Sequence, residues 1–192
     1  MRMQIAKKAI LLVIGSLLLF STTDGQETKG RQEAYSGTAI GTGGTFGGRS
    51  IGFDLRIKRY STDEELQKYA DLVREKGTEA LRRALEREDL GQFSVTGRVG
   101  NQIAVARKRQ VGSETVITLI TARIMPFLEL YRNQRSTDYP FGYMQVKLNE
   151  KGEGSGQIMA AARIRFNKKA GQYEIESFGN QYIKAVNVRP RK

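Results

Sequence analysis

Segments of alternating apolar and polar residues, joined by short connections, are the feature that most restricts the fold of this chain. Such alternation predicts strands that bury one face, as in residues 50–60, where Phe53 and Leu55 share a side. Parallel neighbours need crossovers of a dozen or more residues, whereas antiparallel neighbours need only a turn. We therefore expect a mainly β fold of the α+β kind, an antiparallel curled sheet or barrel of about eight strands. Further strands are expected at residues 93–99, 103–109, 115–122, 143–149, 156–166, 173–178 and 182–188.

Residues 62–89 interrupt this pattern with helical spacing. The run from Ser61 to Glu64 is a capping pattern with acidic residues in the first turn, where the helix dipole favours them. Gly77 is a stop or bend signal, and Thr78 follows it as a second cap. We expect one helical insertion over about 62–89, either a pair of helices or one bent helix. Its apolar positions are Leu66, Tyr69, Ala70, Val73, Leu81, Ala84 and Leu85.

The first 25 residues differ in composition from the rest of the chain. Three basic residues precede an uncharged apolar run from Ala9 to Phe20. As a helix this run spans only about 18 Å, against roughly 30 Å of bilayer hydrocarbon, so its length is typical of a signal peptide. We predict a bacterial protein exported to the periplasm or beyond the cell, with no transmembrane span after cleavage; an uncleaved anchor is the alternative. The predicted divisions are a signal peptide at 1–25, a flexible lead-in at 26–33 and one β-rich domain at 34–192.

The chain contains no Cys, no His and no Trp. These absences exclude Cys or His metal sites, Ser-His-Asp triads, cysteine–histidine nucleophiles and disulfides, and we expect no cofactor. Carboxylates remain as acid–base candidates, but no spacing places Asp54, Glu129 or Asp138 together as a pair. We therefore predict a protein that is not an enzyme, with a carboxylate-dependent hydrolase as the last alternative.

A glycine-rich run from Tyr35 to Arg49 holds six glycines in fifteen residues, and its last two residues form Gly48-Arg49-Ser50 with the residue that follows. A phosphate-binding loop would lead directly into a helix whose N–H groups hold the phosphates. Here an alternating strand follows, and the essential Lys is replaced by Arg49. The glycines therefore indicate a bent strand and a turn, where close backbone approach excludes side chains.

The segment from Arg123 to Phe141 is the longest stretch that fits no strand. It interleaves aromatic and basic side chains, which suit stacking on rings and pairing with anionic groups. The competing interpretation is a short helix from Pro126 that closes one end of the barrel. The candidate ligand-binding residues are Arg123, Phe127, Tyr131, Arg132, Arg135, Tyr139 and Phe141.

Positive charge is concentrated outside the helical segment. The net charge is +12, whereas residues 61–89 hold nine acidic and six basic residues. We expect a basic sheet face at Arg107, Arg109, Arg163 and Arg165. Behind a signal peptide, such a face predicts an anionic lipid or envelope polymer as partner rather than nucleic acid; the competing interpretation is a solvated charged face with no partner.

Two motifs carry a resemblance to a known group of proteins. They are the glycine-rich run YSGTAIGTGGTFGGR at residues 35–49 and DYPFG at residues 138–142. With them the chain resembles, over most of its length after residue 25, a group of uncharacterised exported bacterial proteins. The resemblance implies no activity, cofactor or catalytic residue.

Two binding hypotheses therefore remain ahead of the hydrolase. The first is an exported binding or structural protein whose basic face contacts an anionic envelope component, or which holds a ligand near residues 123–141. The second is a carrier whose barrel holds a small apolar ligand beneath the helical segment, in a pocket lined by residues such as Phe53, Leu55, Ile164 and Phe166. The sequence defines no oligomeric state.

Overall fold

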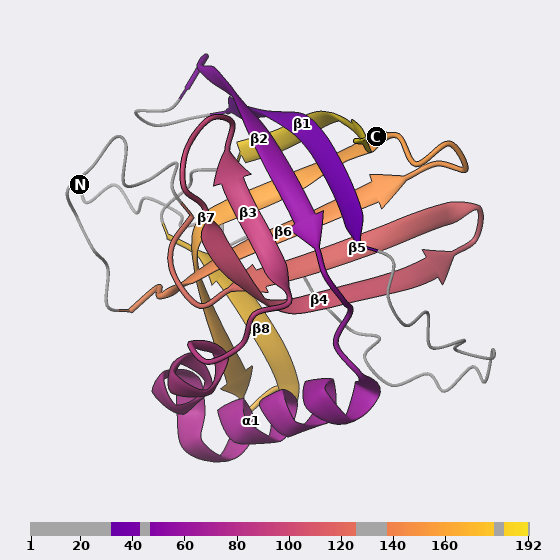
Figure 1. Ribbon diagram of the computed structural model, residues 1–192. Helices are drawn as coiled ribbons and strands as arrows, with labels where there is room; N and C mark the ends of the chain where they lie inside the picture. The colour runs from indigo at the N-terminus through magenta and orange to yellow at the C-terminus, as the bar shows by residue number, and fades with distance from the viewer. Residues whose placement is uncertain (1–31, 43–46, 126–137, 179–182, 192) are drawn as a thin grey trace, which may run out of the picture.

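The computed structural model describes residues 32–42, 47–125, 138–178 and 183–191 (Figure 1). In these ranges an antiparallel sheet of order β6-β5-β4-β3-β2-β1-β9-β7-β8 closes into an eight-stranded barrel, because β6 also pairs with β7. The additional strand, β8, pairs with the second half of β7. The predicted fold class is confirmed. The elements are β1 (Glu33–Gly41), β2 (Ser50–Ile57), α1 (Asp63–Leu85), β3 (Gly91–Val95), β4 (Asn101–Val111), β5 (Glu114–Thr121), β6 (Phe141–Leu148), β7 (Gly154–Asn167), β8 (Gln172–Ser177) and β9 (Ile183–Pro190).

The interior of the barrel is filled by its own side chains. Phe53 and Phe93 are fully buried and stack with their ring centroids 5.4 Å apart. Leu55, Ile117 and Met144 join them in one continuous cluster supplied by strands all round the barrel. An eight-stranded barrel is just wide enough for side chains to fill, so this interior is a packed core.

Part of the glycine-rich run forms β1. A Cβ at Gly37 would lie 2.5 Å from Cζ of Phe53, so the ring packs directly against the strand backbone. Strand β2 follows Gly48 and Arg49, which agrees with the structural interpretation of the glycines and not with a phosphate-binding loop. Residues 1–31, with the predicted signal peptide, lie outside the described residues. Within the described ranges no helix combines the length and apolarity needed to cross a bilayer.

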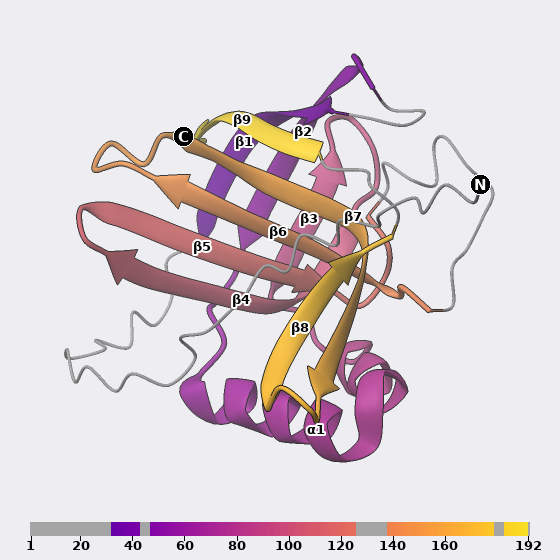
Figure 2. The ribbon, with the colours of Figure 1, turned by 180° about the vertical axis from the view of Figure 1, so that it is seen from behind.

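Helix α1 bends at Gly77 as the sequence predicts, but its capping box lies one residue later than the expected Ser61–Glu64. Thr62 and Glu65 form a reciprocal capping box, and the backbone of Gly77, at φ 80°, interrupts the helix. The helix lies against the outside of the barrel, beneath the β7–β8 hairpin (Figure 2). Two bonds hold it there: Thr78 Oγ1 donates to the Ile164 carbonyl at 2.8 Å, and Tyr173 OH donates to the Ala70 carbonyl at 3.1 Å. The helical segment therefore covers a wall of the barrel.

Two β-bulges exchange the inward and outward faces partway along their strands. In β7 one extra residue lies between the partners of Phe141 and Tyr143. Ile158 consequently faces the barrel interior, whereas Ile164 packs with the residues under α1. Strict alternation through residues 156–166 would have placed both inside, so the expected position of Ile164 is wrong. A second bulge in β4, after Ile103, has the same effect.

Glu33 joins three elements at one end of the barrel. Its carboxylate accepts hydrogen bonds from Tyr35 OH at 2.7 Å, Tyr60 OH at 2.8 Å and Lys108 Nζ at 2.9 Å. Burial opposes ionisation, but these hydrogen bonds and the Lys108 charge outweigh it, so the pKa of Glu33 lies below its usual range. The ionised carboxylate therefore stabilises the fold.

Replacement of Glu33 by Gln is expected to lower the free energy of unfolding by about 1–3 kcal/mol at pH 7, because the amide cannot accept three donors. The pKa of Glu33 is lower in the folded state than in the unfolded state, where it is about 4.3. The stabilisation by the ionised carboxylate is therefore complete above the unfolded-state pKa and is lost as the pH falls through the folded-state pKa. Urea unfolding at pH 7 and pH 3 measures it. The exposed Glu150→Gln control should change little at either pH, and an effect of Glu33→Gln that grows with acidity would contradict the assignment.

Candidate functional site

A pocket of about 160 Å³ lies on the outer face of the barrel, under α1. The helix forms its roof, β4, β5 and β6 form its floor, and the β7–β8 hairpin forms one wall. Most of its lining is apolar, as is usual for sites that bind small molecules. The lining residues are Leu66, Tyr69, Ala70, Val73, Leu81 and Leu85 from α1, Val105, Arg107 and Arg109 from β4, Thr118, Ile120, Tyr143 and Gln145 from β5 and β6, and Ile164, Tyr173 and Ile175 from the hairpin.

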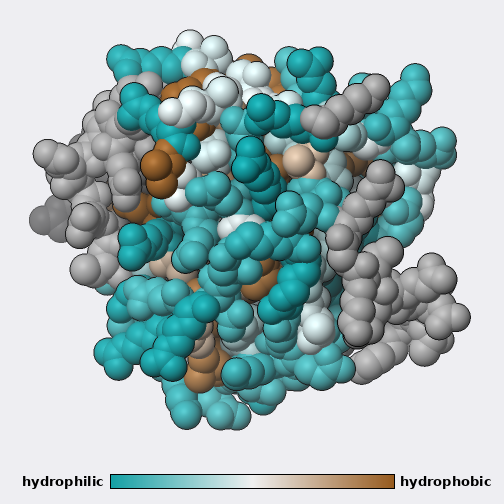
Figure 3. Space-filling view, viewed as in Figure 1, coloured by the Kyte–Doolittle hydropathy of each residue, from teal (hydrophilic) through white to brown (hydrophobic). Residues whose placement is uncertain are grey.

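The roof has one apolar side and one polar side. Tyr69, Val73, Leu81 and Leu85 are buried against the barrel, as the helical spacing predicts. The opposite side carries ion pairs along the helix, such as Arg82 with Glu79 at 2.8 Å. Figure 3 shows a largely hydrophilic surface over the helix, with small apolar patches. The pocket therefore lies behind a charged outer layer.

The apolar floor ends at a buried phenol. Val105, Ile120 and Tyr143 lie opposite one another on three neighbouring strands. Tyr143 is 1% exposed, and its hydroxyl has no hydrogen-bond partner among the described residues. Burial raises the pKa of this phenol to about 12, although the charge of Arg109 acts in the opposite direction. An unpaired buried hydroxyl costs about 1–3 kcal/mol, so such groups call for a physical explanation.

The neighbouring row of the floor is polar and positively charged. Arg107 lies opposite Thr118, which lies opposite Gln145, and Arg109 lies two residues further along β4. Asp63, the ion-pair partner of Arg107 at 3.6 Å, is 91% exposed, so solvent weakens the pair. Burial and the charge of Arg109 lower the pKa of Arg107, against the opposing effect of Asp63. This end of the pocket therefore holds excess positive charge.

The other two arginines of the predicted basic face have a different environment. Arg163 Nη2 lies 2.6 Å from Glu176, and Arg165 Nη2 lies 2.8 Å from Glu174 and 2.6 Å from Glu176. The register places Arg163 opposite Glu176 and Arg165 opposite Glu174. The four predicted residues therefore form two unlike pairs, one inside the pocket and one in a charge-balanced ladder on the hairpin.

The predicted ligand-binding segment is described only at its two ends. Arg123 is exposed just after β5, whereas Phe141 is fully buried in the cluster under α1. Tyr139 packs against Arg163, whose guanidinium lies 5.1 Å from the ring centroid, and edge-on against Phe178 at 5.3 Å. Four members lie outside the described residues: Phe127, Tyr131, Arg132 and Arg135.

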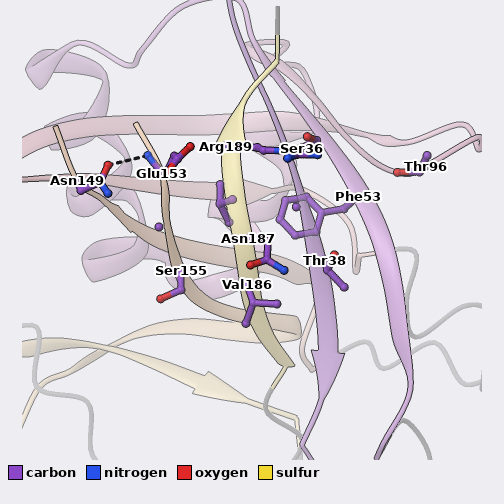
Figure 4. A pocket seen from close by; sticks show the side chains of 13 residues that line it. Ser36, Thr38, Phe53, Thr96, Asn149, Glu153, Ser155, Val186, Asn187 and Arg189 are labelled. Atoms are coloured by element: carbon purple, nitrogen blue, oxygen red, sulfur yellow. Dashed lines mark hydrogen bonds between the residues drawn. The ribbon is translucent and has the colours of Figure 1, made fainter. Parts of the chain in front are cut away.

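A second hollow of about 720 Å³ lies between β1, β9 and the turn joining β6 to β7 (Figure 4). Its lining is mostly polar, and Asn187 occupies it at a bulge of β9 with φ 52°. Asn149 is already used by its own turn, since its Oδ1 accepts the Glu153 N–H at 3.0 Å. This hollow is a polar groove without the apolar enclosure of the pocket under α1.

Sequence reasoning missed most of the pocket, although one signal for it is present. Residues 103–106 of β4 are four consecutive apolar residues, which is typical of a strand covered on both faces. Ile120 likewise faces outward from β5 as an apolar residue. These positions indicated an element packed on the outer wall, but not which one.

Comparison with known proteins adds no further information on function. No protein-family model, no curated protein and no solved structure matches this chain. The resemblance carried by residues 35–49 and 138–142 stays a prediction. Within the described ranges no three carboxylates gather as a possible metal site.

Proposed function

We propose that this chain is an exported, non-catalytic binding protein that holds a small apolar ligand in the pocket under α1. The observation that carries the proposal is an apolar pocket outside a barrel whose interior is already filled by its own side chains. A ligand carrier of this form would use the space between helix and wall, whereas the helix-lidded carrier expected from the sequence would use the barrel interior.

Binding to an anionic envelope component through the basic face is the second candidate. The net charge of +12 favours it. The arginines of the hairpin support it less, because Arg163 and Arg165 are already paired with Glu176 and Glu174. The pocket therefore provides the more specific proposal.

The proposal of export rests on the N-terminal sequence. A basic start followed by the apolar run Ala9–Phe20 is typical of a signal peptide. Fractionation of bacteria that express the full chain, or the chain from residue 26, measures it. Retention of both forms in the cytoplasm would count against export.

A binding titration tests the pocket. The neutral fluorophore 1-aminoanthracene is expected to bind the wild-type chain with a Kd of roughly 1–100 μM. The Ile120→Trp variant places a larger side chain on the pocket floor and should weaken binding by about tenfold or more.

The matched control is Val99→Trp, because Val99 is 90% exposed and lies outside the pocket lining. This variant should bind the fluorophore like wild type. Equal loss in both variants, or no binding to the wild-type chain, would refute the proposed function. Urea unfolding of each variant establishes that both are folded.

A further inference from the structure

We propose that the ligand of this pocket is an amphiphile with a carboxylate headgroup, which Arg107, Arg109 and the Tyr143 hydroxyl bind while its apolar chain lies under α1. The inference rests on the proposed function and adds the chemical class of the ligand. It begins from polar groups at the pocket that the folded chain leaves without adequate partners.

The first observation is the pair of arginines. Arg107 and Arg109 project from the same face of β4, and two neighbouring cations repel each other. Arg109 forms no ion pair with any residue that the structure describes, and the partner of Arg107, Asp63, is almost fully exposed. A bound anion would relieve this repulsion.

The second observation is independent of charge. The Tyr143 hydroxyl is buried without a partner among the described residues, and Tyr143 lines the same pocket. A phenol can donate one hydrogen bond, so an acceptor inside the pocket would satisfy it. Neutral alkyl groups offer no acceptor.

The two observations meet in one geometry. Tyr143 lies two strands from β4, about 10 Å across the sheet at ordinary strand spacing, and Arg107 and Arg109 lie two and four residues along β4 from Val105, the residue in its row. The long arginine side chains therefore reach it only by leaning along the sheet, and the charge of Arg109 is near enough to act on the Tyr143 phenol. A planar carboxylate accepts paired hydrogen bonds from a guanidinium and has lone pairs left for a hydroxyl. The apolar residues Val73, Ile120 and Ile164 would then surround the chain of the ligand.

The experiment compares ligands that share a tail and differ in the headgroup. Isothermal titration of the full chain at pH 7.5 uses octanoate, 1-octanol, octylammonium and acetate. Octanoate should bind at least about tenfold more tightly than 1-octanol, and octylammonium should bind most weakly of the three. Acetate should not bind measurably, because it lacks the tail.

Two double variants locate the effect. In Arg107→Gln with Arg109→Gln, the affinity ratio of octanoate to 1-octanol should fall to near one. The matched control, Arg163→Gln with Arg165→Gln, removes the same charge from outside the pocket and should keep the wild-type ratio. An equal fall in both would assign the preference to net charge and overturn the inference.

Tyr143→Phe tests the hydroxyl alone. It should reduce the octanoate to 1-octanol ratio by about threefold or more, while the thermal stability of the unliganded protein stays the same or rises, since an unpaired buried group is removed. A purely structural hydroxyl would instead lower stability and leave the ratio unchanged.

The outcomes separate this inference from the proposed function. Equal affinity for octanoate and 1-octanol would overturn the headgroup assignment and leave the apolar pocket standing. Failure of both to bind, together with failure of 1-aminoanthracene, would overturn both proposals.

Discussion

Gly156→Val is expected to cost about 3 kcal/mol or more of folding free energy and to leave little folded protein at 37 °C. A Cβ at Gly156 would lie 1.9 Å from the Gln145 carbonyl oxygen and 2.7 Å from the Val146 Cα. Both atoms belong to the backbone of β6, so no side-chain rotation relieves the clash. Because β6–β7 pairing closes the barrel, the strain falls on the strand pair that holds the barrel shut.

Urea unfolding followed by far-UV circular dichroism measures this loss. Gly171→Asn is the matched control, because Gly171 has φ 65° with nothing within 4 Å of an added Cβ, and Asn tolerates that conformation. The control should cost no more than about 1 kcal/mol. Equal stability of the two variants would show that the close approach of the β6 backbone does not restrict the side chain at residue 156.

Phe53→Ala is expected to destabilise the protein by about 3–5 kcal/mol. Phe53 is fully buried, stacks on Phe93 and packs against the bare backbone of Gly37. Its removal leaves a cavity that a closed barrel cannot collapse to fill. Phe53→Leu retains most of the apolar volume and should cost about 1–1.5 kcal/mol.

The same variants separate stability from binding. Phe53 lies inside the barrel wall, whereas the pocket lies outside it under α1. Phe53→Leu should therefore bind 1-aminoanthracene with a Kd within about threefold of wild type, measured under conditions where it is folded. A large loss of affinity would indicate that the ligand lies in the barrel interior, as the helix-lidded carrier requires, or in the second hollow, which Phe53 also lines.

The location of α1 is what gives a filled barrel an apolar pocket. Small barrels hold ligands inside only when their side chains leave space, and here Phe53, Phe93 and Met144 occupy that space. The β7–β8 hairpin extends beyond the closed barrel and gives the helix a second surface to pack against (Figure 2). The pocket lies where helix, hairpin and wall meet.

Much of the fold could be predicted from local patterns. The strand at residues 50–57, a capped helix start within one residue of Thr62 and the bend at Gly77 all follow from interactions between residues at most four apart. The short turns then required antiparallel pairing. Arg107 and Arg109 stand out in the sequence as part of an expected basic face, and the structure places both at the pocket under α1.

The remaining members of the site depend on contacts between distant residues. Nothing near Tyr143 in the sequence indicates that its hydroxyl is buried without a partner, because its burial follows from packing against residues of β5, β7 and β8. The residues next to Arg107 and Arg163 in the sequence likewise do not indicate that the two side chains have opposite environments. Arg163 meets Glu176 through the register of a hairpin, whereas Arg107 faces a helix that comes earlier in the chain, with β3 between them.

By itself, the sequence of this protein determined the period of each segment, the capped and bent helix, the antiparallel connections, and the absence of Cys and His chemistry. Only the tertiary structure decided the closure of the barrel, the bulges that turn Ile164 toward α1, and the joining of two arginines with an unpaired phenol in one pocket. The physical reason is the sequence separation of the residues that interact. Side-chain period is set by neighbours along the chain, while register, bulges and the packing of a helix on a wall are set by contacts that form only when distant strands meet.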